Sequence, residues 1–182
     1  MKRIVKSSLI VVVLLLLVTG CGKKDNIDIV NMDGTTSKRS ENPLYNINVN
    51  GSGTLSCTRS ANAYSGLTAS FNYAITYKKG IITFIHSIEK VKGDDSSALD
   101  EYEEAYNKIK DRYSSIKYYD ITVTRDNNSV IYDSNIDYEK VDMNKILKLE
   151  GNENNIYDSN NKLELKKWYS FVKKMGTTCK GV

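Results

Sequence analysis

The sequence predicts an α+β domain, in which an antiparallel sheet of about five strands carries helices packed on one face. Several segments alternate apolar and polar side chains with the period of two that half-buried strands show. Other segments repeat apolar residues every three or four positions, as amphipathic helices do. Polar turns at 79–80 and 126–128 join neighbouring strand-like segments. Strands joined in this way, with helices gathered on one side, make a two-layer domain.

Five segments are predicted as strands: 54–59, 68–78, 81–91, 121–124 and 130–138. The second and third form a hairpin through Lys79 and Gly80, because glycine adopts the positive φ that such turns need. The alternation predicts the inward faces of this hairpin. These inward residues are Phe71, Tyr73, Ile75 and Tyr77 on one strand and Ile82, Phe84, His86 and Ile88 on the other.

Three helices are predicted. The longest begins near Ser97 and Asp100, which fit a capping pattern, and carries an apolar stripe of Leu99, Tyr102, Tyr106, Ile109, Tyr113 and Ile116. Its acidic residues crowd the N-terminal turn and its basic residues the other end, as the helix dipole favours, so no cation site is needed to explain them. A short helix follows over 141–149. The last starts at Asn161 and Glu164, has an inner stripe of Leu165, Trp168, Val172 and Met175, and ends at Gly176 as a left-handed cap.

The N-terminus resembles a bacterial lipoprotein signal. Three positive charges in the first six residues precede ten consecutive apolar residues, too few for a spanning helix of roughly 20. The run ends in Val18, Thr19, Gly20 and Cys21, which resembles a lipobox, and Cys21 is the predicted lipidation site. The alternative is a short signal anchor with an incidental cysteine.

The chain therefore divides into a signal peptide over 1–20, a lipid anchor and polar tether over 21–53, and a single α+β domain over 54–182. A short edge strand within 44–50 is left open. Acyl chains on Cys21 would hold the protein in the outer leaflet of the bacterial cell membrane, facing the extracytoplasmic side.

Cys57 and Cys179 remain after Cys21 is lipidated. Two thiols in an oxidising compartment are expected to pair, and this bond would tie the first strand to the segment after the last helix. Two separate buried thiols are the alternative. A redox-active pair is a third option, although the chain has no C-x-x-C motif.

Charge and motifs exclude several function classes. The chain has 26 basic and 22 acidic residues, and removal of three basic residues with the leader leaves 23 against 22, which gives no footprint for nucleic acid. Catalytic motifs such as G-x-S-x-G and H-E-x-x-H are missing from the sequence. His86, the only histidine, is interpreted as a half-buried structural residue. No catalytic residue, metal ligand or cofactor is predicted.

Tyr118 and Tyr119 are candidate contact-surface residues, because neighbours on a strand point to opposite faces and one of them should be exposed.

The order of elements resembles that of the YehR-like small bacterial lipoproteins, a family of unknown function. The stretches that carry the resemblance are Thr-Leu-Ser-Cys-Thr-Arg at 54–59, Tyr-Lys-Lys-Gly at 77–80, the helix at 106–113, Lys-Val-Asp-Met at 140–143 and Met-Gly-Thr-Thr-Cys-Lys at 175–180. Thr177 departs from the pattern, in which an aromatic residue is expected. The resemblance implies an α+β fold and assigns no catalytic residue.

The expected function is that of a membrane-anchored extracytoplasmic lipoprotein that binds an envelope protein or ligand without catalysing a reaction. The alternative is a cell-envelope hydrolase that uses a carboxylate pair or His86, since the chain is rich in carboxylates.

Overall fold

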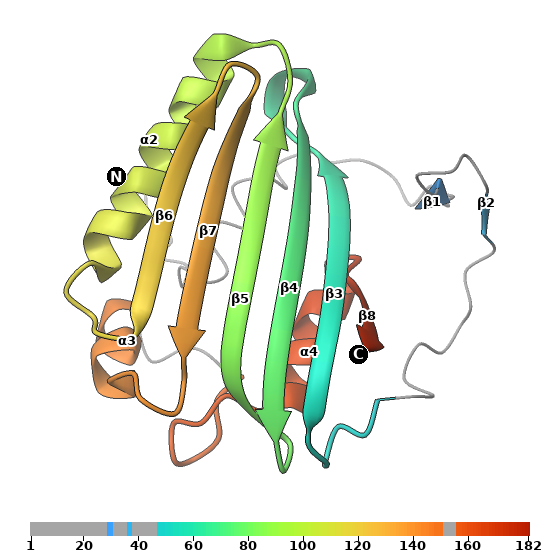
Figure 1. Ribbon diagram of the computed structural model, residues 1–182, viewed down its shortest axis with the longest axis vertical. Helices are drawn as coiled ribbons and strands as arrows, with labels where there is room; N and C mark the ends of the chain where they lie inside the picture. The colour runs from blue at the N-terminus through green and yellow to red at the C-terminus, as the bar shows by residue number, and fades with distance from the viewer. Residues whose placement is uncertain (1–28, 31–35, 38–46, 151–155) are drawn as a thin grey trace, which may run out of the picture.

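A six-stranded antiparallel sheet forms the centre of the computed structural model, which describes residues 29–30, 36–37, 47–150 and 156–182. The strand order is β6-β7-β5-β4-β3-β8 (Figure 1). The strands are β3 (Gly53–Asn62), β4 (Thr68–Lys78), β5 (Ile81–Lys92), β6 (Tyr119–Asp126), β7 (Ser129–Asp137) and β8 (Thr178–Gly181). The predicted signal peptide and Cys21 lie outside the described residues.

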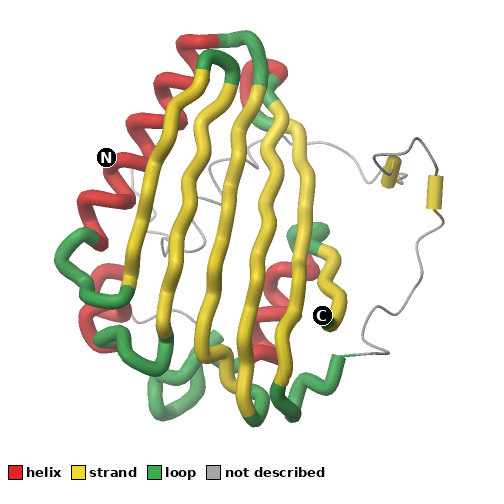
Figure 2. The backbone as a smooth tube through the Cα atoms, viewed as in Figure 1, coloured by secondary structure: helices red, strands yellow, loops and turns green. Residues whose placement is uncertain are grey.

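The helices all lie behind the sheet in Figure 1, so the fold is the predicted α+β class with helices on one face. They are α2 (Ser96–Tyr113), α3 (Met143–Glu150) and α4 (Leu165–Lys174). α2 packs against β6, β7 and β5. The opposite face of the sheet, toward the viewer in Figures 1 and 2, is not covered by any helix of the described chain.

The sheet has one strand more than predicted. The extra strand is β8, which follows α4 and pairs with the edge of β3 over four residues. The sequence allows a short edge strand within 44–50, but residues 47–50 do not form a strand, and 44–46 lie outside the described residues. Two further short strands, β1 (Ile29–Val30) and β2 (Thr36–Ser37), pair with each other in the predicted tether.

The helical stripes are confirmed and the first helix boundary is corrected. Leu99, Tyr106, Ile109, Tyr113 and Ile116 are buried, and Tyr102 is partly buried against them. The cap of α2 is Asp95, whose carboxylate accepts a hydrogen bond from the Ala98 amide at 3.0 Å, rather than Ser97. Asp95 competes better because its β-region backbone places its side chain over the free amides.

The last helix ends as predicted but begins later: Asn161 lies before it with φ of +60°, and Glu164 is its N-cap residue without a capping hydrogen bond from its side chain. Leu165, Trp168 and Val172 are buried, and α4 begins directly after Glu164. Gly176 follows with φ of +86°, which is the predicted left-handed cap.

The inward face predicted for β5 is wrong for three of its four residues. The ladder pairs Thr76 with Phe84 and Tyr77 with Ile82, so Thr83 is an extra residue in a bulge. An extra residue reverses the alternation of side chains beyond it. Ile82 is therefore buried as predicted, whereas Phe84, His86 and Ile88 lie on the open face. The residues that turn inward instead are Ile85, Ser87, Glu89 and Val91.

Candidate functional site

Polar side chains occupy the middle of the buried sheet face. Register places Arg59, Phe71, Glu89 and Tyr132 side by side on β3, β4, β5 and β7. The adjacent row, two residues along each strand, consists of Cys57, Tyr73, Ser87 and Ser134. Because paired residues of a sheet point to the same side, both rows face the helices. The core therefore contains a buried cation, a buried carboxyl and several hydroxyl groups.

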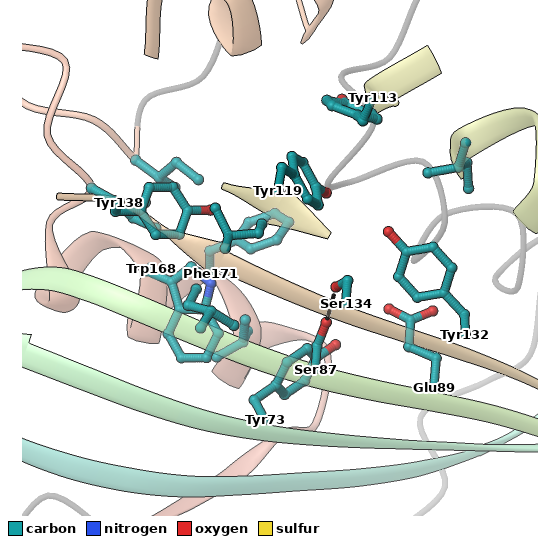
Figure 3. Close-up of a pocket in the computed structure, with 16 residues that line it drawn as sticks. Tyr73, Ser87, Glu89, Tyr113, Tyr119, Tyr132, Ser134, Tyr138, Trp168 and Phe171 are labelled. Carbon is teal, nitrogen blue, oxygen red and sulfur yellow. Dashed lines mark hydrogen bonds between the residues drawn. The ribbon is translucent and has the colours of Figure 1, made fainter. Parts of the chain in front are cut away.

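A cavity of about 70 Å³ lies between this face and the helices. Figure 3 shows aromatic rings around it, contributed by the sheet, by the end of α2 and by α4. The lining residues are Tyr73, Ile85, Ser87, Glu89, Ile109, Tyr113, Tyr119, Tyr132, Ser134, Ile136, Tyr138, Ile156, Leu163, Trp168, Phe171 and Val172. The cavity is thus mainly apolar and aromatic, with a few polar groups, as small-molecule sites are.

Glu89 is the one charged residue among those that line the cavity. The residue is 6% exposed, and its Oε2 atom has no hydrogen-bond partner in the described part of the chain. Burial raises the pKa of this carboxyl to about 7, although the Arg59 guanidinium and the Tyr106 hydroxyl partly offset the rise. At neutral pH the group is therefore poised between its acid and its carboxylate.

The neighbouring hydroxyl groups stay protonated. Burial raises the pKa of Tyr132 to about 12 and raises that of Tyr73 further. The Tyr73 hydroxyl has no hydrogen-bond partner within the described residues. Ser87 and Ser134, in contrast, bond to each other across the strands at 2.7 Å, as the dashed line in Figure 3 marks. Unsatisfied buried polar groups are uncommon in folded proteins, so they indicate a water or ligand site.

Arg59 supplies the positive charge of the row without lining the cavity. Its guanidinium carbon lies 4.0 Å from the centre of the Phe71 ring, and its Nη1 donates to the Met175 carbonyl at 3.3 Å. Burial lowers the pKa of this group, and Tyr73 and Glu89 oppose the shift. Phe71 stands between Arg59 and Glu89 in the register, and the two groups still act on each other through their charges: Glu89 raises the pKa of Arg59, and Arg59 lowers the pKa of Glu89.

The arrangement of strands and helices matches a solved structure. The NMR structure of the E. coli YehR protein aligns with a TM-score of 0.51 at 20% identity, covering 71% of this chain and 92% of that one. The fold is YehR-like. This is the fold that the sequence resemblance implied, and at this identity the likeness extends to the fold alone.

A second, weaker alignment accompanies this YehR-like fold. It is with the NMR structure of a protein from Streptococcus pneumoniae TIGR4, with a TM-score of 0.44 at 16% identity, and it covers 88% of this chain and 100% of that one. No protein-family model matches the chain. The curated proteins contain no match either.

The predicted cysteine pair is joined in the structure. Cys57 on β3 and Cys179 on β8 are opposite one another in register and form a disulfide with a Cα–Cα distance of 4.0 Å. This distance is shorter than the usual range of about 4.4–6.8 Å. Both residues are buried, at 0% and 3% exposure, so the bond lies inside the core.

Tyr118 and Tyr119 point to different surroundings. Tyr118 is 38% exposed with φ of +67°, and the ammonium groups of Lys117 and Lys140 lie 4.8 and 5.6 Å from its ring centre. Tyr119 is buried, packs on Tyr113 with ring centres 4.8 Å apart, and lines the cavity. The structure therefore does not join the two into one contact surface.

His86 lies on the open face of the sheet, where its Nε2 is 3.0 Å from the Asp133 Oδ1. Its partners in register are Ala74 and Asn135, neither of which is a nucleophile. Because His86 and Glu89 are three positions apart on one strand, they face opposite sides of the sheet. The two groups cannot serve one site.

Sequence reasoning missed Glu89 because it assigned the wrong phase to β5. The sequence did contain one signal. Ile85, Glu89 and Val91 fall on the same side of an alternating strand, so an apolar face that contains a carboxylate was an alternative to the face of Phe84 and Ile88.

Among the described residues, no group of three or more His, Cys, Asp or Glu side chains is placed to hold a metal ion. No helix in the described part is long and apolar enough to cross a membrane.

Proposed function

We propose that this protein is a membrane-anchored extracytoplasmic lipoprotein whose domain binds a small ligand in the cavity between sheet and helices, without catalysing a reaction. The observation that carries the proposal is the buried Glu89, whose Oε2 lacks a partner in the described chain while its carboxyl lines an aromatic cavity. A buried carboxyl without a hydrogen-bond partner destabilises the fold, and such groups are found at ligand-binding sites, where the ligand supplies the partner.

The anchor in this proposal rests on the N-terminal sequence. The positive start, the ten apolar residues and Cys21 in a lipobox-like context predict lipidation. A buried disulfide between Cys57 and Cys179 is in keeping with an oxidising compartment.

Binding is favoured over catalysis by the groups that the cavity brings together. Glu89 has no second carboxylate among the cavity-lining residues of the described chain, and carboxylate-based glycoside hydrolysis uses two. Ser87 and Ser134 are bonded to each other rather than to a base. One observation favours the alternative of an envelope hydrolase: a pKa of about 7 suits Glu89 to general acid or base work.

The test is a fragment titration of the full chain in detergent, read by the fluorescence of Trp168. This residue is the only tryptophan of the chain and lines the cavity, so its emission reports occupancy. Ser134→Leu fills the cavity from β7, and the matched control Asn135→Leu changes the next residue, which faces the open side.

We expect fragments to change Trp168 emission in the wild type and in Asn135→Leu, and not in Ser134→Leu. If Ser134→Leu does not fold, nuclear Overhauser contacts from a bound fragment to the Trp168 indole locate the ligand in the wild type instead. Binding that survives Ser134→Leu in a folded protein, or a wild type that binds nothing, contradicts the proposal.

A further inference from the structure

We infer that the cavity ligand is a small organic cation, an ammonium group with a few carbon atoms, held by Glu89 within a cage of aromatic rings. The inference rests on the proposed function and names the chemical class of its ligand. Three features of the cavity lead to it: its charge, its aromatic lining and its size.

The charge of the lining is negative, and Arg59 and Tyr106 offset it only in part. Glu89 is the one lining residue with an acidic or basic side chain that can ionise near neutral pH. The lining tyrosines stay neutral, because burial raises their pKa values. Its Oε2 makes no hydrogen bond within the described chain, and the residue is 94% buried, being 6% exposed. Arg59 acts on this carboxyl through its charge, but its guanidinium lies over the Phe71 ring and its Nη1 donates to the Met175 carbonyl. A ligand cation would supply the partner that the protein does not.

Aromatic rings make up a large part of the lining. Seven of its sixteen residues carry an aromatic ring: Tyr73, Tyr113, Tyr119, Tyr132, Tyr138, Trp168 and Phe171. Figure 3 shows these rings on several sides of the cavity, with the Glu89 carboxyl beside the Tyr132 ring. Trp168 is fixed by an edge-to-face contact with Tyr73, at 5.8 Å between ring centres and 83° between planes. The faces of such rings attract cations, and aromatic cages bind quaternary ammonium groups.

The size of the cavity limits the ligand to a few non-hydrogen atoms. Its volume is about 70 Å³, several times the roughly 10–15 Å³ that one water molecule requires. An alkylammonium or a choline-sized cation is therefore of the right order, whereas a sugar ring or a peptide would need the core to open.

The experiment compares two probes of the same shape by calorimetry on the full chain in detergent. Choline carries a quaternary nitrogen, and 3,3-dimethylbutan-1-ol carries a carbon in its place. We expect choline to bind at least about tenfold more tightly, because ring faces and a desolvated carboxylate both favour the charge. Glu89→Gln, which keeps the volume, should remove this preference. Glu139→Gln, on an exposed residue, should leave it unchanged.

A pH series on the wild type keeps the test independent of the folding of Glu89→Gln. Choline affinity should fall as the pH drops below about 7, where Glu89 takes up a proton, and the affinity of the neutral probe should not change. The groups that face Glu89 are Arg59 from β3, Tyr73 from β4, Tyr132 from β7 and Tyr106 from α2, and all keep their protonation state in this range.

The outcomes separate the two proposals. Equal binding of both probes, or binding of neutral fragments at Trp168 with no binding of choline, overturns the cation inference and leaves the proposed function standing. A wild type that binds neither probe nor any fragment overturns both. Choline binding that persists in a folded Glu89→Gln protein with its preference intact overturns the role given to Glu89.

Discussion

Glu89 is the residue on which the chemistry of this domain depends. Its carboxyl is buried on the sheet face that the helices cover, and its pKa rises to about 7 because burial disfavours the charged form. Burial of the Glu89 carboxyl lowers the stability of the fold, and it also strengthens the attraction of the ionised carboxylate for a ligand cation. A buried carboxyl without a ligand is a source of instability that depends on pH.

Stability should fall with rising pH on account of Glu89. The folded pKa of about 7 lies above the value of 4.5 for a free glutamate, so between these values the folded state holds a proton that the unfolded chain has released. The contribution is fully present below pH 4.5 and is lost as the pH rises to about 7. At higher pH the cost is on the order of 3 kcal/mol. Chemical denaturation of the wild type and of Glu89→Gln from pH 4 to about 8 measures it, in the absence of added ligand.

In that comparison the Glu89→Gln protein should be more stable than the wild type above pH 7 and should lose most of the slope in this window. Glu139→Gln, on the surface, serves as the matched control and should follow the wild-type curve. Parallel curves for wild type and Glu89→Gln would show that the carboxyl is not desolvated in solution.

At the scale of elements, one bulge determines what the middle of the sheet presents to the helices. Thr83 is the unmatched residue, and it turns Ile85, Ser87 and Glu89 inward while Phe84, His86 and Ile88 turn outward. Without the extra residue, the histidine would enter the core and the carboxyl would face outward. The cavity chemistry is therefore a consequence of a local irregularity in backbone pairing.

Truncation of Ile85 and of Ile88 should have unequal effects on stability. Ile85 is 7% exposed and lines the cavity, so Ile85→Ala should lower the free energy of unfolding by about 2–5 kcal/mol. Ile88 lies on the open face, so Ile88→Ala should cost less than half as much. Urea denaturation of both variants provides the measurement. The reverse order would mean that β5 follows the simple alternation and has no bulge.

The end of α4 depends on a glycine for conformational reasons alone. Gly176 has φ of +86°, and an added Cβ would meet no atom within 4 Å. Gly176→Ala should therefore destabilise the protein by about 1 kcal/mol through backbone strain without a clash. Gly176→Asn should cost less, because asparagine tolerates the left-handed region better. Thermal unfolding of the two variants tests this, and an equal loss in both would argue against a left-handed cap.

At the scale of the whole molecule, the last strand closes the domain on its first. β8 has four residues and lies at the edge of the sheet, where the chain ends in Figure 2. It would be a weak edge strand by itself, but Cys179 bonds it to Cys57 on β3. The bond spans 122 residues, so it restricts the unfolded chain strongly. It also holds the segment around Met175, whose carbonyl receives the Arg59 hydrogen bond.

Loss of the disulfide should cost about 2–5 kcal/mol, because the closed loop is long. Denaturation of the double variant Cys57→Ala/Cys179→Ala, compared with reduced wild type, measures this effect and separates loss of the bond from loss of the thiols. Ligand binding at Trp168 should persist in the folded double variant, since neither cysteine lines the cavity. A double variant as stable as the oxidised wild type would remove the structural role of the bond.

The predicted anchor is tested in cells by Cys21→Ala. If Cys21 carries the lipid, the Cys21→Ala variant should leave the membrane fraction, while the wild type fractionates with the membrane; a variant that stays there with an uncleaved leader would indicate a signal-anchored protein. Mass spectrometry of the native N-terminus should find a diacylglyceryl group on Cys21. A wild type that keeps its leader and lacks the lipid would instead be a signal-anchored protein.

The sequence by itself determined the fold class, the helical stripes, the Gly176 cap and the pairing of the two remaining cysteines. Each of these features depends on the periodicity of a local segment or on the chemistry of a single residue type, and both can be read from the sequence. Tertiary structure alone decided the phase of β5, and with it the exposure of His86 and the burial of Glu89. A bulge is set by pairing with another strand, and both phases of the segment 81–91 contain apolar residues, so the alternation could not reveal it. The polar part of the cavity lining likewise exists because pairing brings strands distant in sequence together, which places Glu89 beside Tyr132 and Ser87 beside Ser134.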